Sequence, residues 1–281
     1  MQKSNKVNNK IKTLVIYLVS AAGFIWSIFP IYWMIKSSLT PNAEMYGLNP
    51  QLLPSRFTFE HYEQLFTETT FIRYFLNSVY VAVFSTIVAL VLSILASYAM
   101  TRLKFKARNF IRRGVLYAYL LPTAVLFIPM YIMISRIGLG DNKNSLIIVY
   151  QTFIIPYCCY MLMSYFTAIP KSMEEAAFID GCSHIQALIK VILPIAAPSI
   201  AVVATFAFTM SWNEYLYALV LTTSPSQQTV TIGISGFRYS DNYIWGLIMG
   251  SSVVASLPAV CLYMLAQRFM VTGLAAGGVK Q

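Results

Sequence analysis

The sequence predicts an all-α membrane protein with six transmembrane helices. The chain has 281 residues, of which 58% are hydrophobic and only 11% are charged. Soluble domains carry about 25% charged residues, so this composition excludes an ordinary soluble domain. The hydrophobic residues are grouped in runs of about 20, the length of helix that crosses a bilayer core. The six predicted spans lie near residues 14–35, 77–100, 114–135, 146–168, 198–222 and 245–267.

Residues 1–36 are predicted to form the N-terminal segment and the first transmembrane helix. The first apolar run is too long for a cleavable signal peptide, and no small-residue cleavage site follows it. We therefore expect it to be retained as a span. Residues 37–76 are predicted to form a loop on the other side of the membrane, and the amphipathic stretch from Phe57 to Phe75 is expected to lie on the membrane surface.

The remaining five spans form a core over residues 77–267, interrupted by a polar hairpin over residues 170–196. Ser172 and Glu175 have the spacing of a capping box, so the first helix of the hairpin should begin near Met173. A glycine suits the left-handed position that ends a helix, and Gly181 is placed for that role. The hairpin therefore begins with a short helix of about two turns.

A second helix of the hairpin is predicted to begin at Ser183, because Ser183 and Gln186 repeat the capping-box spacing. Its apolar residues recur at helical spacing and predict one buried face. Pro194 and Pro198 are expected to mark its exit into the fifth span. The apolar residues are Ile185, Leu188, Ile189 and Ile192.

The chain contains 20 Lys and Arg residues against 10 Asp and Glu, and their distribution predicts the orientation. With six spans, 14 of these basic residues fall on the side that holds both termini and the hairpin, and six of the 14 crowd residues 102–113. The positive-inside rule therefore places both termini, including the tail over residues 268–281, in the cytoplasm. An anionic inner leaflet is the simplest partner for the basic loop, so the charge does not indicate nucleic acid.

The hairpin also carries the residues of a known motif. Its sequence resembles the EAA-x3-G-x9-I-x-LP loop of ABC importer permeases, with Val191 in place of the usual Ile. Further matches run in order from about residue 60 to the C-terminus, among them Ala96-Ser97-Tyr98-Ala99 and Trp212-Asn213-Glu214. The overall pattern is most similar to the MalG-like permeases of carbohydrate ABC importers. The motif residues are Glu175, Ala176, Ala177, Asp180, Gly181, Leu193 and Pro194.

The resemblance implies a type I ABC importer permease fold and a carbohydrate substrate. It also implies three kinds of partner: a second permease subunit in a heterodimer, a cytoplasmic dimer of ATP-binding subunits, and an extracytoplasmic solute-binding protein. Membrane lipids are a fourth partner, expected from the basic loop. The motif residues of the hairpin would couple the permease to the ATP-binding subunits. The chain would then lie in the cytoplasmic membrane of a bacterium or an archaeon.

Four residues of the fifth span are candidates for the translocation path: Trp212, Asn213, Glu214 and Tyr217. Burying a carboxylate in lipid costs roughly 2.5 kcal/mol or more, so Glu214 should face a partner or a wet cavity. Two interpretations remain open. Glu214 either lines the path, or it is a hydrogen-bonded structural residue at a contact between helices.

Residues 223–244 form a polar loop without a strong helix signal. Loops of this kind tend to be functional or mobile. By resemblance, Gln227, Gln228 and Ser235 are candidate contacts for the solute-binding protein. The alternative is that the loop only connects two spans.

The sequence does not predict an enzyme. It lacks the G-x4-G-K-[ST] phosphate-binding loop, so ATP and Mg²⁺ are expected on a separate subunit and no cofactor on this chain. His61 and His184 fall on opposite sides of the membrane, so no metal site is predicted. Two alternatives are an ion-gradient-driven secondary transporter and a membrane enzyme or scaffold. The first should show inverted repeats and several intramembrane charges, and the second a catalytic cluster.

Overall fold

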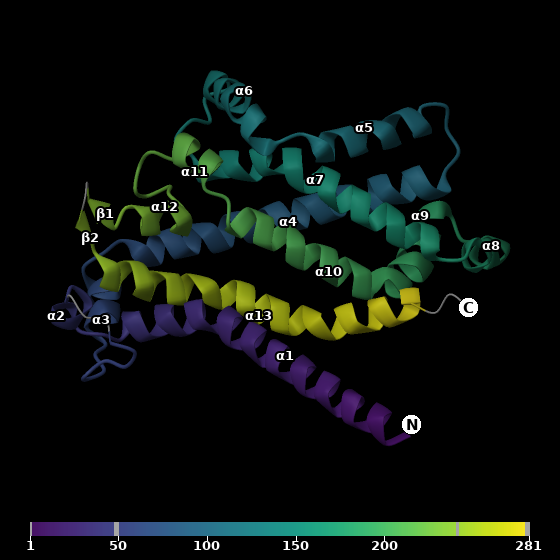
Figure 1. The fold of residues 1–281 in the computed structure, drawn as a ribbon. Helices are drawn as coiled ribbons and strands as arrows, with labels where there is room; N and C mark the ends of the chain where they lie inside the picture. The colour runs from purple at the N-terminus through teal and green to yellow at the C-terminus, as the bar shows by residue number, and fades with distance from the viewer. Residues whose placement is uncertain (1, 48–50, 240–241, 279–281) are drawn as a thin grey trace. The chain divides into compact units, whose positions relative to one another are not determined.

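The computed structural model describes residues 2–47, 51–239 and 242–278. Within these ranges the chain is almost wholly helical, which confirms the all-α fold class (Figure 1). Five of the described helices are long and apolar enough to cross a membrane, and a bent pair of helices makes a sixth span if it is counted as one. The candidate spans are Lys12–Ser38, Phe71–Arg102, Arg108–Leu120 with Thr123–Arg136, Lys143–Ala168, His184–Trp212 and Trp245–Phe269.

The helices and strands are labelled in chain order in Figure 1. One two-residue antiparallel ladder, with Arg238 opposite Tyr243, is the β-structure within the described ranges. The elements are α1 (Gln2–Ser38), α2 (Asn42–Met45), α3 (Glu60–Thr67), α4 (Phe71–Arg102), α5 (Arg108–Leu120), α6 (Thr123–Arg136), α7 (Lys143–Ala168), α8 (Lys171–Ile179), α9 (His184–Ala187), the π-helical turn η1 (Leu188–Ile192), α10 (Leu193–Trp212), α11 (Leu216–Leu221), α12 (Val230–Ser235), β1 (Arg238–Tyr239), β2 (Asn242–Tyr243) and α13 (Trp245–Gly278).

The chain divides into two compact units, of which the first comprises residues up to 69 together with residues 234–254. Its centre is the fully buried His61 of α3, whose Nε2 atom lies 2.8 Å from the carbonyl oxygen of Thr40. A Cβ atom on Gly246 would lie 2.2 Å from the His61 ring, so only glycine permits this approach. Helix α3 is therefore packed into its unit through a polar side chain.

The predicted amphipathic stretch is divided between two helices. Helix α3 ends at Thr67, and α4 begins at Phe71, earlier than the predicted start of the second span at residue 77. Phe71 is fully buried, and Phe75 packs edge-on against Trp212 with ring centroids 5.6 Å apart. The expectation that the whole stretch from Phe57 to Phe75 lies on the membrane surface is therefore wrong for its last residues, which form the first turn of α4 and bury Phe71 in the second unit.

The second unit comprises residues 70–233 and the chain from residue 255 onward. Helices α4 and α7 form its centre, and α10 packs against both. Small side chains lie at every fourth position of α4 and are fully buried, which lets the backbone of α7 approach closely. The hydroxyl groups of Ser93 and Ser97 donate hydrogen bonds to the carbonyl oxygens of Ile155 and Cys159. These small residues are Ser85, Ala89, Ser93 and Ser97.

The third predicted span, near residues 114–135, is not a single helix. Helices α5 and α6 meet at an angle of 100° across Leu121 and Pro122. A proline disfavours the helical conformation of the residue before it, and Leu121 accordingly has an extended ψ of 129°. The span is therefore broken where the sequence carries its Leu-Pro pair.

The fifth predicted span is displaced toward the hairpin. The second helix of the hairpin continues without a break from His184 to Trp212, instead of ending at Pro194 and Pro198 as predicted. The π-helical turn η1 directly precedes Pro194, and this local change in hydrogen bonding accommodates the N–H group that proline lacks. The span consequently ends at Trp212 and not near residue 222.

Two other spans are close to their predicted positions. Helix α7 (Lys143–Ala168) contains the predicted range 146–168, and α13 contains the range 245–267. Helix α13 continues through residue 278, so most of the predicted tail is helical backbone. Residues 279–281 lie outside the described part of the chain.

Candidate functional site

The first helix of the hairpin, α8, ends as predicted at a left-handed glycine. Gly181 has a φ of +83°. Its N–H group donates to the carbonyl oxygen of Phe178 at 3.0 Å, and the N–H group of Cys182 donates to that of Ala177 at 2.9 Å. This pair of hydrogen bonds is the Schellman arrangement, which satisfies the last carbonyl groups of a helix. The sharp turn in the hairpin therefore depends on a residue without a Cβ atom.

Of the two predicted capping boxes, the second is present in the structure and the first is not. Ser183 and Gln186 form one, because the Ser183 N–H group donates to the Gln186 side chain at 2.8 Å and the Ser183 hydroxyl accepts from the Gln186 N–H group. Ser172 does not cap α8. The helix begins at Lys171, directly after Pro170, so Ser172 is already its second residue. Proline sets the entry conformation there, so Ser172 and Glu175 lie within the helix and are exposed.

The predicted coupling residues divide into an exposed set and a packed set. Glu175, Ala176 and Asp180 are exposed, and the neighbouring Ile179 is 87% exposed. Ala177 is buried, and Leu193 packs against the core of the second unit while Pro194 is exposed. Helix α8 therefore presents an acidic and apolar face outward. Ile179 is not among the predicted residues, although its position beside the motif is a usable signal.

Glu174, next to the predicted Glu175, is the acid that contacts the bundle. Its side chain is 6% exposed, and its carboxylate lies 3.3 Å from Nε of Arg102 on α4. The Tyr98 hydroxyl, one turn earlier on α4, donates a hydrogen bond to the same carboxylate. Arg102 in turn donates from Nη2 to the carbonyl oxygens of Phe166 and Ile169, at 2.7 and 2.8 Å. This cluster ties α8 to the ends of α4 and α7.

The apolar face predicted for the second helix of the hairpin is only half buried. Leu188 and Ile192 are buried against the core, whereas Ile185 and Ile189 are 66% and 57% exposed. A π-helical turn rotates successive side chains by a smaller angle than an α-helix, so the α-helical spacing does not describe one face here. Ile185 and Ile189 remain available to lipid or to a partner.

Glu214 lies in the break between α10 and α11 and not inside a span. Its carboxylate accepts three hydrogen bonds: from the hydroxyl of Tyr150 at 2.8 Å, from the N–H group of Tyr217 at 2.9 Å, and from that of Ala218 at 3.1 Å. Its carbonyl oxygen accepts a bond from the hydroxyl of Thr231 at 2.9 Å. These contacts satisfy the first amide groups of α11 and are what the structural interpretation of Glu214 requires.

The other three candidate path residues differ in exposure. Trp212 is buried and donates from Nε1 to the carbonyl oxygen of Ala255 at 3.1 Å. Tyr217 is buried, and its hydroxyl donates to the carbonyl oxygen of Thr123 at 2.8 Å. Asn213 is exposed at the end of α10. Among the four, Asn213 is therefore the exposed residue, and Glu214 is half-buried.

The polar loop after α11 is held by hydrogen bonds within the second unit. The Asn77 amide donates to the carbonyl oxygens of Ser226 and Gln228, at 3.0 and 2.9 Å. The Gln227 side chain accepts from the N–H group of Lys143 at 3.1 Å. Gln227 and Gln228 are half-buried, and Ser235, which belongs to the first unit, is exposed.

Asp141 holds the first residues of the polar loop after α11 through hydrogen bonds. Its carboxylate accepts hydrogen bonds from the N–H groups of Thr223 and Ser224, both at 2.8 Å, and from the Ser224 hydroxyl. The bonds from the Ser224 side chain and backbone, with those from Thr223, hold the pKa of Asp141 below its usual range. The carboxylate is consequently charged at neutral pH, and the loop has a defined conformation.

A bundle of apolar helices with a short polar hairpin, held against the bundle by buried contacts, defines a polytopic membrane protein. Residues 89–272 match the family described as the binding-protein-dependent transport system inner membrane component, and the chain belongs to this family. The resemblance to ABC importer permeases is thereby confirmed, and the ion-gradient alternative has no support.

Relatives and solved structures agree with this assignment. The inner membrane ABC transporter permease protein YcjP of Escherichia coli (strain K12) is 37% identical, with 94% of this chain and 95% of the relative covered. The trehalose/maltose transport system permease protein MalG of Thermococcus litoralis is 32% identical, with 96% and 98% covered. A chain from the crystal structure of a bacterial ABC transporter for the acidic polysaccharide alginate has a TM-score of 0.81 at 20% identity, with 93% and 97% covered.

Proposed function

We propose that this chain is the permease subunit through which a carbohydrate enters the cell, delivered by an external solute-binding protein and driven by ATP. Relatives named as permeases for trehalose, maltose and diacetylchitobiose support a carbohydrate substrate. A second permease subunit completes the path as a heterodimer, and a dimer of ATP-binding subunits holds the ATP and Mg²⁺. The observation that carries the proposal is the hairpin, whose α8 exposes Glu175 and Ile179 while the buried Glu174 ties it to the bundle.

The hairpin can transmit force because it is anchored at both ends. The ion pair between Glu174 and Arg102 joins α8 to α4 and, through the carbonyl groups that Arg102 binds, to the end of α7. On the other side of Gly181, α9 continues directly into α10. When the ATP-binding subunits close on α8, the hairpin moves as a rigid body and carries these helices between the outward- and inward-facing states.

The remaining predicted residues have separate roles in this mechanism. Asn213, Glu214, Trp212 and Tyr217 lie near the path, where Asn213 contacts the sugar and the other three keep the break between α10 and α11 in shape. Gln227, Gln228 and Ser235 contact the solute-binding protein. The hydrogen bonds from Asn77 and to Asp141 support this role for the loop, because a preformed loop costs less conformational entropy on docking.

Transport by the reconstituted complex tests the proposed function. Proteoliposomes containing the complex, the solute-binding protein and labelled trehalose, maltose or diacetylchitobiose should accumulate one of these sugars only when ATP reaches the ATP-binding subunits. Accumulation should persist when proton and sodium gradients are collapsed. Uptake that follows an ion gradient and ignores ATP would overturn the proposal.

The same assay, applied to two glycine variants, tests whether the hairpin binds the ATP-binding subunits. Gly181→Asp should lose attachment of the ATP-binding subunits and uptake, because a side chain strains the left-handed turn and adds charge beside α8. Gly138→Asp is the control, since Gly138 also has a positive φ, +74°, but lies between α6 and α7. It should retain the subunits. Equal attachment in both variants would contradict the docking role of the hairpin.

The proposed orientation, with both termini in the cytoplasm, is tested by labelling. In a variant that retains Cys182 and replaces Cys158, Cys159 and Cys261, a membrane-impermeant thiol reagent should react only from the cytoplasmic side. A second variant without native cysteines and with Ser226→Cys should react only from outside, because Ser226 is exposed in the opposite loop. Labelling of Cys182 from outside would reverse the topology.

A further inference from the structure

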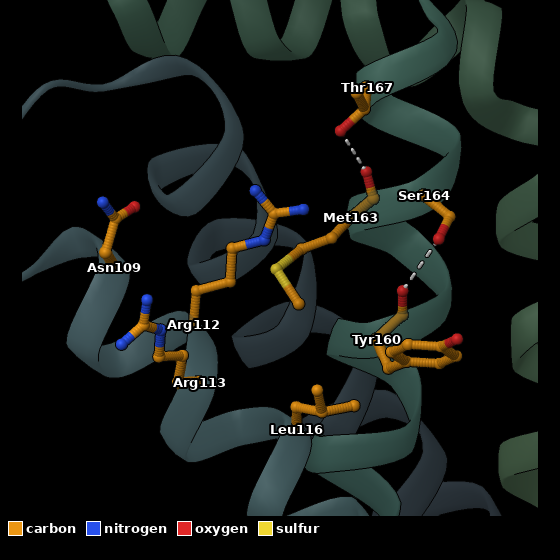
Figure 2. Close-up of a pocket in the computed structure, with 8 residues that line it drawn as sticks. All are labelled: Asn109, Arg112, Arg113, Leu116, Tyr160, Met163, Ser164 and Thr167. Atoms are coloured by element: carbon orange, nitrogen blue, oxygen red, sulfur yellow. Dashed lines mark hydrogen bonds between the residues drawn. The ribbon is translucent and has the colours of Figure 1, made fainter.

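A cleft of about 650 Å³ lies between α5 and α7, in the second unit (Figure 2). Its lining consists of two matching stripes, each with the i, i+3, i+4, i+7 spacing of one helix face. The stripe of α5 is Asn109, Arg112, Arg113 and Leu116, and the stripe of α7 is Tyr160, Met163, Ser164 and Thr167. Two facing helix surfaces therefore leave room between them for a ligand.

The cleft is polar and cationic at one end. Figure 2 shows the Arg112 guanidinium group reaching into the space between the two helices. No acidic residue lines the cleft, and within the described residues no carboxylate pairs with Arg112 or Arg113. The hydroxyl groups of Thr167 and Ser164 donate to carbonyl oxygens of their own helix. The guanidinium groups and the Asn109 amide are therefore the free donors, and they suit an oxyanion.

The other end of the cleft is apolar. Leu116 and the Tyr160 ring line it, and the largely buried Met163 lies beside the Arg112 side chain (Figure 2). Tyr160 stacks on Tyr119 of α5, with ring centroids 5.2 Å apart, so the two helices are in contact beneath the cationic end. Beside the cleft, α5 also carries large exposed apolar side chains, with Phe110 82% exposed. A ligand that matches a cleft with one cationic end and one apolar end has a phosphate at one end and hydrocarbon at the other.

We propose that the cleft binds the headgroup phosphate of an anionic phospholipid from the cytoplasmic leaflet. The two arginines hold the phosphate, and the first part of an acyl chain lies over Leu116 and the Tyr160 ring. Guanidinium groups bind phosphate through paired N–H donors, and basic pockets between transmembrane helices on the cytoplasmic side are suited to anionic headgroups. A bound lipid would fix the separation of α5 and α7. It would thereby fix the position of the C-terminal end of α7, whose Phe166 carbonyl group accepts a hydrogen bond from Arg102.

The test uses the assembled importer in nanodiscs of phosphatidylcholine with a minor fraction of phosphatidylglycerol. Native mass spectrometry counts the phosphatidylglycerol retained after release from the nanodisc. Arg112→Gln with Arg113→Gln should lower the affinity for phosphatidylglycerol about thirtyfold, as expected for the loss of two cations near an anionic headgroup, and fewer lipids should be retained. Lys104→Gln with Lys106→Gln is the matched control. Both lysines are exposed just before α5 and outside the cleft, so this variant should retain the lipid.

A second variant removes the volume of the cleft and leaves its positive charge unchanged. Ser164→Trp fills the cleft while both arginines remain, and it should also lose the lipid. Displacement of phosphatidylglycerol by inorganic phosphate alone would assign the site to free phosphate. Wild-type retention in both cleft variants, or equal loss in the lysine control, would overturn the proposal. The proposal rests on the cytoplasmic orientation proposed above, but lipid retention is measured without transport, so the two can fail separately.

Discussion

Glu174→Ala is expected to lower the free energy of unfolding of the solubilised complex by about 3–5 kcal/mol, the usual cost of removing one partner of a buried ion pair. The substitution leaves the Arg102 guanidinium, whose side chain is 4% exposed, facing a site without a carboxylate. It also removes the acceptor of the Tyr98 hydroxyl. Thermal unfolding of the complex in detergent, measured beside uptake, checks the expectation.

The neighbouring acid provides a matched control for this substitution. Glu175→Ala removes the same charge from the next residue of α8, but Glu175 is exposed and has no partner within the described residues, so stability should stay unchanged. Uptake should fall in both variants: through loss of anchoring in the first, and through a weaker contact with the ATP-binding subunits in the second. Equal thermal stability of the two variants would show that the buried ion pair does not hold the hairpin.

Glu214→Leu is expected to destabilise the complex by several kcal/mol. It removes the acceptor of the Tyr150 hydroxyl, which is fully buried, and of the Tyr217 and Ala218 N–H groups. Each buried donor left unsatisfied costs about 1–3 kcal/mol. Glu214→Gln should be milder, because the amide oxygen still accepts on one side while its NH₂ group cannot replace the second acceptor. Thermal unfolding of both variants gives the comparison.

Asn213→Ala is the control, because its side chain is exposed beside Glu214 and makes no hydrogen bond within the described residues. We expect it to keep the stability of the wild type and to change sugar uptake or selectivity. A Glu214→Leu complex that unfolds at the wild-type temperature but fails to transport would instead support Glu214 as a path-lining residue. Loss of stability and uptake together supports the structural role.

Short-range rules were sufficient for several features of this chain. The apolar runs predicted the spans because about 20 residues of helix are needed to cross the bilayer core wherever they occur. Gly181 predicted the end of α8, since a left-handed residue after a helix is a local requirement. The capping box of Ser183 and Gln186 is equally local, with both partners three residues apart.

Proline illustrates where local rules were insufficient. Pro122 breaks the third span by 100°, whereas Pro194 and Pro198 lie in a continuous helix. The difference is in the surroundings: a π-helical turn precedes Pro194 and lets the chain continue, and α10 packs on α4 and α7 along its length. The same residue type therefore gives opposite results, and packing decides between them.

The sequence by itself determined that the chain is a helical membrane protein with an EAA-type hairpin, because composition, span length and turn chemistry are properties of contiguous residues. Only the tertiary structure decided which acids contact partners far away in the sequence. Glu174 and Glu175 are adjacent, and the rotation of α8 against α4 buries the first and exposes the second. Glu214 meets Tyr150 across 64 positions of sequence. A buried carboxylate is stable only where packed helices bring distant donors to it, and local spacing does not encode that arrangement.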